Sequence, residues 1–477
     1  MIARPPMVPA KFTRSRRGTI GESVMIDRRN MLGMAAAGAV ALTTAREANA
    51  GAKPHAPAAA GPGARSFPPG FLWGTATAGH QVEGNNVNAC NWVLENVKPT
   101  LYAQPSGDAC NSFALWERDL DLVQAMGLNT CRFSLEWARI EPEQGLFSGA
   151  MLDHYKAIID GCLARGLKPM VTFNHYTAPR WFAARGGWTD AGAADLFTRF
   201  CEKAARHLAG GIAMATTLNE PNIMNILQVI LPPQVFVVQK EMLAAAARAT
   251  GGTKFSAANA IDLDDIPLAT RYLIAGHKAA RAAIKGVRPD LPVGVSLSMF
   301  DDQVAPGAKP ARRDAAREML YGPWLEAVRG DDFLGVQNYE RVVWGDHGRL
   351  PAPAGAVLNF SGSEVYPPSL GNAVRYAHQA TGCPIVVSEH GVATADDTVR
   401  VGMIKDGLAG LHAAMVDGVP VRGYVHWSLI DNFEWISGYK SKLGLHSFDP
   451  VTFARSAKPS AGVLGAIARV NALPAKG

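Results

Sequence analysis

Two glutamates, each at the end of a short apolar run, are the residues of this 477-residue chain that most directly suggest chemistry. Glu389 follows the run 385–388, and Glu220 follows the run 215–219. Short runs of apolar and β-branched residues are typical of strands buried in a parallel sheet. Two carboxylates that face one pocket from such strand ends form the pair that hydrolyses glycosidic bonds.

The elements that would position these glutamates alternate between strands and helices. Helices are predicted at about 112–126, 152–165, 195–208 and 269–285, with Gly127 and Gly166 in stop positions after the first two. Strands are predicted at 71–75, 129–137, 168–174, 213–218, 293–298, 333–337, 385–388 and 421–428. This alternation predicts parallel strands with crossover helices, and eight such units predict a single (β/α)8 TIM barrel of the α/β class. Glu220 and Glu389 then follow the fourth and seventh strands, at the C-terminal ends where such barrels carry their chemistry.

The formal charge of +6 does not indicate a nucleic-acid or membrane surface. Residues 1–50 hold eight Lys/Arg and three Asp/Glu, a net charge of +5, so residues 51–477 carry only +6 − 5 = +1. The positive charge therefore belongs to the N-terminal leader, and we expect neither a nucleic-acid partner nor integral membrane association.

The leader resembles a bacterial twin-arginine export signal. Arg28-Arg29 precedes a weakly apolar run at 31–44, and residues 48–50 (Ala-Asn-Ala) form a small-residue cleavage site. Met25 is an alternative start that would give a more compact signal. The Ala/Pro/Gly-rich stretch 51–66 predicts a linker, so the catalytic domain is expected at 67–470, in a periplasmic or secreted protein.

The six cysteines show no metal-ligand spacing, and no glycine-rich phosphate loop is present, so no metal or cofactor is expected. Cys131, Cys162 and Cys201 lie in predicted strands or helices and are expected to be buried thiols. Cys90 and Cys110 lie in loop-like sequence, where an oxidising compartment would permit a disulfide between them. The sequence does not decide whether this disulfide forms.

Six ordered motifs over about 67–464 resemble those of the retaining β-glycosidases of glycoside hydrolase family 1. The motifs are Phe71-Leu72-Trp73-Gly74-Thr75-Ala76-Thr77 with Gln81 and Glu83; Arg132-Phe133-Ser134 with Trp137 and Arg139; His175; Thr217-Leu218-Asn219-Glu220-Pro221; Ser388-Glu389-His390-Gly391; and Trp427-Ser428-Leu429-Ile430-Asp431-Asn432-Phe433-Glu434-Trp435.

This resemblance implies a role for each matching residue. Glu220 would be the general acid/base and Glu389 the nucleophile, with Arg132 either the cation that keeps Glu389 charged or an ordinary salt bridge at the barrel rim. Trp427 would be a stacking platform for the sugar. The residues implied to hold its hydroxyls are Gln81, His175, Asn219, Glu434 and Trp435. A carboxylate at 434 would repel a sugar 6-phosphate, and the phospho-β-glycosidase branch usually has serine there.

Three positions depart from the family pattern. Tyr176 replaces the usual Trp after His175, and His390 replaces the usual Asn after the nucleophile. Asn338 occupies the place of a Tyr that supports the nucleophile, unless a one-residue shift brings Tyr339 there. Within the segment 222–262, which resembles nothing specific, the apolar run from Ile226 to Val238 either lines an aglycone site or packs on the barrel.

The leading hypothesis is an exported, cofactor-free β-glycosidase that removes terminal β-glycosyl residues, glucose first, with retention of configuration. Two alternatives use the same two glutamates. The sugar could be galactose, fucose or xylose, or the main reaction could be transfer of the sugar to an acceptor. A non-catalytic sugar-binding barrel is the alternative from another class. The substrate partner would be a small-molecule or oligosaccharide β-glycoside, and the sequence gives no oligomeric state.

Overall fold

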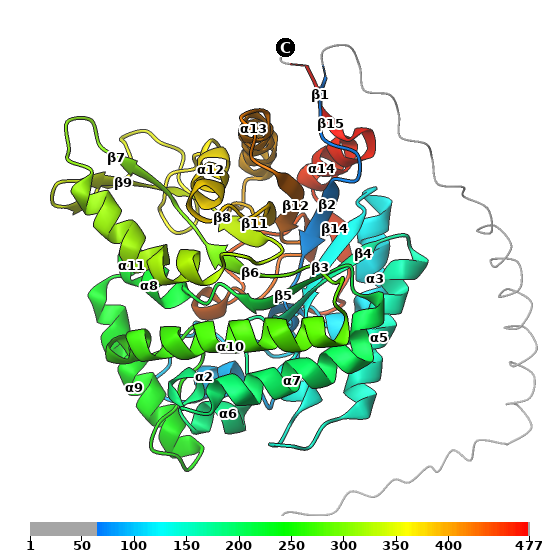
Figure 1. The fold of residues 1–477 in the computed structure, drawn as a ribbon, viewed down its shortest axis with the longest axis vertical. Helices are drawn as coiled ribbons and strands as arrows, with labels where there is room; N and C mark the ends of the chain where they lie inside the picture. The colour runs from blue at the N-terminus through cyan, green and yellow to red at the C-terminus, as the bar shows by residue number, and fades with distance from the viewer. Residues whose placement is uncertain (1–63, 476–477) are drawn as a thin grey trace, which may run out of the picture. The chain divides into compact units, whose positions relative to one another are not determined.

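Eight parallel strands close into a barrel at the centre of the computed structural model, which describes residues 64–475 (Figure 1). In barrel order the strands are β2 (Leu72–Ala76), β3 (Thr130–Ser134), β4 (Lys168–Asn174), β5 (Met214–Asn219), β6 (Val293–Ser298), β8 (Leu334–Asn338), β11 (Ile385–His390) and β12 (Val421–Trp427). Parallel pairing of β12 with β2 closes the ring. The predicted barrel is confirmed, and the largest difference in strand ends is at β3, which stops at Ser134 where the sequence predicts Trp137.

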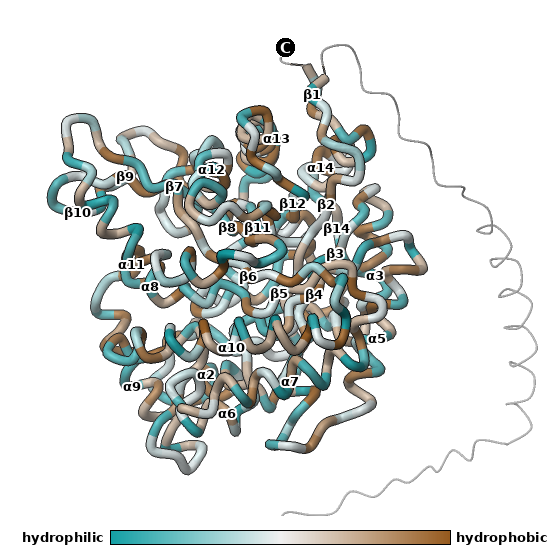
Figure 2. The backbone as a smooth tube through the Cα atoms, viewed as in Figure 1, coloured by the Kyte–Doolittle hydropathy of each residue, from teal (hydrophilic) through white to brown (hydrophobic). Residues whose placement is uncertain are grey.

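Eight of the longer helices in the described residues cover the outside of the barrel, as crossover connections require. They are α3 (Ser112–Ala125), α5 (Gly149–Ala164), α7 (Ala193–Leu208), α10 (Ile266–Val287), α11 (Ala311–Ala327), α12 (Ser369–Thr381), α13 (Asp397–Val416) and α14 (Pro459–Val470). Gly127 and Gly166 follow α3 and α5 with φ of 75° and 70°, so both predicted stops hold. In Figure 2 the tubes of α7 and α10 alternate between teal and brown, as expected for helices with one apolar face.

Shorter elements and the 17-residue helix α9 extend the loops between the strands and helices of the barrel. They are α1 (Gly79–Val82), α2 (Cys90–Asn96), α4 (Trp137–Ile140), α6 (Arg180–Ala184), α8 (Ile223–Ile230), α9 (Pro233–Ala249), the small sheet β7 (Asp301–Val304), β9 (Arg341–Gly345) and β10 (Gly348–Arg349), and the hairpin β13 (His446–Phe448) with β14 (Arg455–Ala457). Most of them follow the C-terminal end of a barrel strand. These loops therefore surround the end of the barrel at which chemistry is expected.

Apolar side chains fill the barrel on both sides of its wall. Inside, Met170, Phe333 and Val386 belong to one buried cluster, and a larger cluster lies between the strands and the helices. Strands covered on both faces read as continuous apolar runs, which is why 385–388 stands out in the sequence.

The two ends of the described chain are joined by a short antiparallel pair. β1 (Arg65–Ser66) pairs with β15 (Ala472–Leu473), with Arg65 opposite Leu473. The last two residues of the predicted linker are thus part of a strand. The predicted export signal and the rest of the linker up to residue 63 lie outside the described residues.

The disulfide that the sequence left open between Cys90 and Cys110 is not formed, and both residues are buried free thiols. Cys90 begins helix α2 and its Sγ contacts Asn91 Oδ1 at 3.1 Å. The Cys110 Sγ instead donates to the carbonyl oxygen of Asp431 at 3.3 Å, so the two thiols have separate partners.

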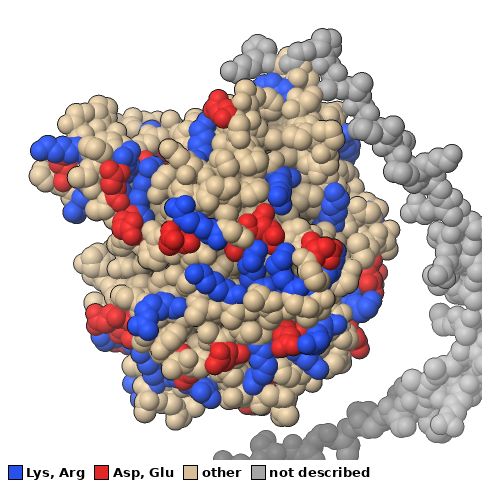
Figure 3. Space-filling model, in the orientation of Figure 1, with Lys and Arg blue, Asp and Glu red and all other residues tan. Residues whose placement is uncertain are grey.

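Lys/Arg and Asp/Glu side chains are interspersed on the face shown in Figure 3, without a continuous area of either sign. This mixture fits the small net charge of residues 51–477. Within the described residues, no helix combines the length and the apolarity needed to cross a bilayer.

Candidate active site

A cavity of about 320 Å³ opens at the C-terminal ends of the barrel strands. Glu220 directly follows β5 and Glu389 lies near the end of β11, and both side chains line this cavity. The other sequence-predicted residues that line it are Gln81, His175, Tyr176, Asn219, Tyr339, Trp427, Glu434 and Trp435. The fold therefore brings together residues that are more than 300 positions apart in the chain, Gln81 and Trp435 among them.

Arg132 holds Glu389 from below the cavity. Its Nη1 donates to Glu389 Oε1 at 2.5 Å, and its Nη2 donates to Asn219 Oδ1 at 2.6 Å. The guanidinium is buried, and its Nε donates to Thr172 Oγ1 at 3.1 Å, so it bridges β3, β4, β5 and β11. A buried, multiply bonded guanidinium is a fixed positive charge beside the carboxylate.

The register at the end of β8 decides which side chain reaches Glu389. Tyr339 donates its hydroxyl to Glu389 Oε2 at 2.6 Å. Asn338 instead faces helix α12, where it accepts from Ser369 Oγ at 2.7 Å and donates to the carbonyl oxygen of Met299 at 2.9 Å. Because alternate residues of a strand point to opposite faces, Asn338 lies outside the pocket, and its predicted place beside Glu389 is corrected in favour of Tyr339.

Glu220 has different surroundings, with a phenol in place of a cation. The Tyr176 hydroxyl donates to Glu220 Oε2, and both Tyr176 and Ser298 act to lower the pKa of this carboxyl. Tyr176 and Glu220 both adopt left-handed backbone conformations, with φ of 68° and 40°. Such conformations cost roughly 1–3 kcal/mol in residues other than glycine and persist where the surrounding structure fixes them.

These surroundings act differently on the pKa values of the two carboxyl groups. Burial, and then the negative charge of Glu389, raise the pKa of Glu220 to about 8. Burial also raises the pKa of Glu389, but the charge of Arg132 and the hydrogen bond from Tyr339 oppose that rise. Glu220 is therefore the group that holds a proton near neutral pH, and Glu389 is the group built to carry the negative charge.

The deep end of the pocket presents polar atoms that have no partner within the protein. Gln81 Oε1, His175 Nδ1 and Gln337 Oε1 are buried without a hydrogen bond. Burial lowers the pKa of His175, so its imidazole is neutral. Because buried polar atoms are almost always paired, this set is suited to the hydroxyl groups of a sugar.

Aromatic rings form the wall beside these polar atoms. His175 stacks on Trp427 with ring centroids 5.5 Å apart and on Trp435 at 6.3 Å. Trp427 Nε1 donates to Glu434 Oε1 at 3.1 Å, and burial raises the pKa of Glu434 to about 8. The flat aromatic wall is suited to the apolar C–H face of a pyranose ring, and the adjacent carboxyl and amide groups are suited to its hydroxyl groups.

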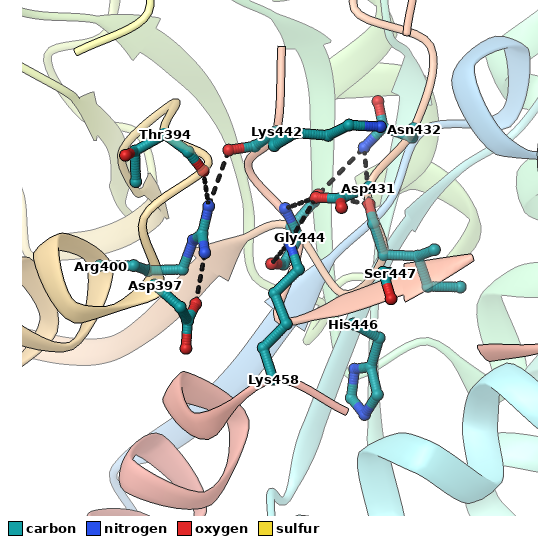
Figure 4. A network of polar contacts seen from close by, with 12 residues as sticks. Thr394, Asp397, Arg400, Asp431, Asn432, Lys442, Gly444, His446, Ser447 and Lys458 are labelled. Atoms are coloured by element: carbon teal, nitrogen blue, oxygen red, sulfur yellow. Dashed lines mark hydrogen bonds and ion pairs between the residues drawn. The ribbon is translucent and has the colours of Figure 1, made fainter. Parts of the chain in front are cut away.

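The loop that carries Glu434 and Trp435 is anchored by a network behind the pocket (Figure 4). Lys458 Nζ donates to Asp431 Oδ1 at 2.7 Å and to the carbonyl oxygen of Gly444 at 2.8 Å. Arg400 binds the carbonyl oxygens of Thr394 and Lys442, each at 2.7 Å, and pairs with Asp397. These contacts fix both ends of the loop and so hold the sugar-facing side chains in place.

His390, the departure next to the nucleophile position, points away from the pocket. Its Nδ1 lies 2.9 Å from the Tyr424 hydroxyl, and its ring lies close to Gly407 of α13. Burial lowers its pKa to about 3, so the ring is neutral. Among the described residues, His390 is therefore not one of the hydrogen-bond partners of the Glu389 carboxyl.

Among the pocket residues that were not singled out from the sequence, Gln337 and Ser298 lie beside the two glutamates. Gln337 donates to Asn219 Oδ1 at 2.8 Å, and Ser298 lies at the end of β6. Both belong to predicted strands, and the period of two that places Tyr339 in the pocket also places Gln337 there. The alternation at the end of β8 was the signal that identifies Gln337.

Comparison with known proteins gives concordant results. The model of "Glycosyl hydrolase family 1" matches residues 64–262 and 360–472. A "Beta-glucosidase" of Agrobacterium sp. is 28% identical over 466 residues, covering 85% of this chain and 96% of the relative. "Thermostable beta-glucosidase B" of Thermobispora bispora is 29% identical over 457 residues, covering 88% and 94%.

Solved structures agree with these sequence matches. The crystal structure of a β-glycosidase named BGL167 is 42% identical, with a TM-score of 0.81 over 86% of this chain and 99% of that chain. The apo structure of a β-glucosidase named 1317 is 38% identical, also with a TM-score of 0.81, over 84% and 98%. With a family match over more than half of its length and close relatives over most of it, this chain belongs to glycosyl hydrolase family 1 and is a glycoside hydrolase.

Proposed function

We propose that this enzyme is an exo-acting retaining β-glucosidase, with Glu389 as nucleophile and Glu220 as acid/base. The observation that carries the proposal is the contrast between two carboxyl groups in one cavity. Glu220 has a pKa raised to about 8, and Glu389 is paired with Arg132 at 2.5 Å. The β-glucosidase names of the relatives support glucose as the sugar.

In the first step Glu389 attacks the anomeric carbon while Glu220 protonates the glycosidic oxygen. The bond from the anomeric carbon to that oxygen breaks, the aglycone leaves as an alcohol, and a glycosyl ester of Glu389 remains. Tyr339 and Arg132 hold the two oxygens of Glu389, so the carboxylate is oriented before it reacts.

In the second step Glu389 has lost its negative charge, and Glu220 changes from a proton donor to a proton acceptor. The negative charge of Glu389 is one cause of the raised pKa of Glu220, and esterification removes that charge. The pKa of Glu220 then falls, and its carboxylate accepts a proton from the water that attacks the ester. The sugar leaves with its original configuration, and both carboxyl groups return to their starting states.

The lining of the pocket favours an unphosphorylated sugar. No Lys or Arg is found among the described residues that line the cavity, so a phosphate group would lose its water without meeting a positive charge. Since Glu434 has a pKa near 8, the absence of basic residues is a stronger argument here than repulsion by a carboxylate.

A panel of nitrophenyl glycosides with product analysis tests the proposal. We expect the β-glucoside to be cleaved fastest and to give β-glucose as the first product. Faster cleavage of a galactoside, fucoside or xyloside would change the sugar, and a dominant transfer product would change the reaction. Binding of sugars without any cleavage would favour the non-catalytic barrel.

We also propose that the enzyme is exported through the twin-arginine-type leader. The support is the sequence alone, Arg28-Arg29 before the apolar run 31–44. N-terminal sequencing of a radiolabelled precursor and its product would locate the start and the cleavage after Ala50. An unprocessed protein that stays in the cytoplasm would reject this proposal.

A further inference from the structure

The half of the pocket beyond Glu220 differs in composition from the deep end. Six apolar side chains line the cavity on and around helix α8, and we call the part of the cavity that they border the outer chamber. They are Leu101, Ile223, Ile226, Leu227, Ile230 and Met242. Helix α8 supplies four of them, and it begins only three residues after Glu220.

The position of α8 is fixed relative to the acid/base. Asn222, just before the helix, donates to the carbonyl oxygen of Ser298 at 2.8 Å and accepts from the Ser298 N–H at 3.2 Å. Glu220 would protonate the oxygen between sugar and aglycone, so the space beside α8 is the space for the aglycone. Ile223, Leu227 and Ile230 follow the i, i+4, i+7 spacing of one helix face, and that face lines the cavity.

The polar side chains that border the outer chamber, Gln239, Asn259 and Tyr102, each use at least one polar atom for a hydrogen bond within the protein. Gln239 Nε2 donates to the carbonyl oxygen of Ile261 at 2.8 Å. Asn91 donates both to Asn259 Oδ1 at 3.1 Å and to the Tyr102 hydroxyl at 2.8 Å. A second sugar placed here would lose hydrogen bonds to water for several hydroxyl groups and regain few of them.

The opposite wall of the cavity offers little more to a sugar. Asn359 Oδ1 accepts from the N–H groups of Ser361 and Ser363, at 2.9 Å and 3.0 Å. Glu340 adds a carboxyl group to the cavity lining, and burial raises its pKa. One carboxyl group at the rim fits an uncharged aglycone better than an anionic one.

We propose that the outer chamber binds an apolar, uncharged aglycone, an alkyl or aryl alcohol, in preference to a second sugar. This inference rests on the proposed function, because it identifies the aglycone side by the role of Glu220. Transfer of apolar surface from water into such a chamber raises affinity with each buried methylene.

The test is kcat/KM for a series of n-alkyl β-glucosides from methyl to hexyl, with cellobiose for comparison. The alcohols of this series have similar leaving-group acidity, so differences report on binding in the outer chamber. We expect kcat/KM to rise about two- to fourfold per methylene, and hexyl glucoside to exceed cellobiose. A flat series with cellobiose as the better substrate would overturn the inference.

A double variant, Leu227→Gln with Ile230→Gln, tests the same surface by mutation. We expect it to lose about tenfold or more on hexyl glucoside and less than about threefold on methyl glucoside. Val237→Gln on α9 is the matched control, because Val237 is 62% exposed and does not line the cavity. An equal loss on both glucosides would contradict the inference.

Failure of the proposed function gives a different result. In that case no β-glucoside, including nitrophenyl glucoside, would be cleaved with retention. Cleavage of nitrophenyl glucoside together with a flat alkyl series would reject only the outer chamber. If the double variant fails to fold, the alkyl series on the wild-type enzyme still decides.

Discussion

Two strand ends of this barrel carry the same side chain in one pocket, yet they prepare it for opposite tasks. At the end of β11, Glu389 meets a buried guanidinium and a phenol. At the end of β5, Glu220 meets a phenol, and no ion pair joins it to a cation among the described residues. Arg132, on a third strand, forms an ion pair with only one of the two glutamates, and its charge favours the ionised form of that one, Glu389.

The largest expected effect comes from removing the charge at the β11 end. Glu389→Gln keeps the shape of the side chain but not the nucleophile, and we expect kcat to fall by roughly 10⁴-fold or more. Stopped assays on nitrophenyl glucoside would measure the loss. Full activity in this variant would end the assignment of Glu389.

The two ends are distinguished most sharply by azide rescue. In Glu389→Gly azide takes the place of the nucleophile and would give the α-glucosyl azide. In Glu220→Ala azide would instead attack the glycosyl ester and give the β-glucosyl azide. NMR of the products identifies the anomer. The same anomer from both variants would contradict the assignment of different roles to Glu389 and Glu220.

A smaller effect is expected for Glu220→Gln, and it should depend on the leaving group. Without a proton donor, cleavage of an alkyl glucoside should slow by roughly 10²–10⁴-fold. Formation of the glycosyl enzyme from dinitrophenyl glucoside should hardly change, because that phenolate leaves without protonation. A uniform loss for both substrates in pre-steady-state assays would argue against an acid/base role.

At the β11 end, Tyr339→Phe removes one hydrogen bond to the charged form of Glu389. We expect roughly a 10- to 100-fold loss of kcat. Since Tyr339 lowers the pKa of Glu389, its removal should also move the acid limb of the pH profile to higher pH. Tyr321→Phe is the matched control, because Tyr321 donates to Asp302 at 3.1 Å outside the pocket. A normal rate and an unmoved acid limb would show that Tyr339 does not support Glu389.

At the β5 end, Tyr176→Phe should have the smallest effect on rate and a visible effect on pH dependence. The wild-type enzyme needs Glu220 protonated, so activity should fall as pH rises through about 8. Tyr176 lowers the pKa of Glu220, so its removal should raise that pKa and move the alkaline limb to higher pH. A shift to lower pH in kcat/KM would contradict the contact between Tyr176 and Glu220.

The strands and the two glutamates could be predicted because they depend on local pattern. Apolar runs identify β5 and β11, and the residue after each run falls at the mouth of the barrel. The register at the end of β8 could not be fixed, because alternation alone does not say which of two neighbouring residues faces the pocket, and a one-residue shift exchanges Asn338 for Tyr339. The contact of Tyr176 with Glu220 also escaped prediction, since it joins two loops with unusual backbone angles.

The pairing of β1 with β15 has a practical consequence for the use of this enzyme. Both ends of the described chain lie side by side beyond the N-terminal ends of the strands, whereas the pocket opens at their C-terminal ends (Figure 1). A support or reporter protein attached after Ala475 would therefore leave the pocket facing the medium. Tethered in this way, the enzyme should retain its kinetics on bulky glycosides as well as on small ones.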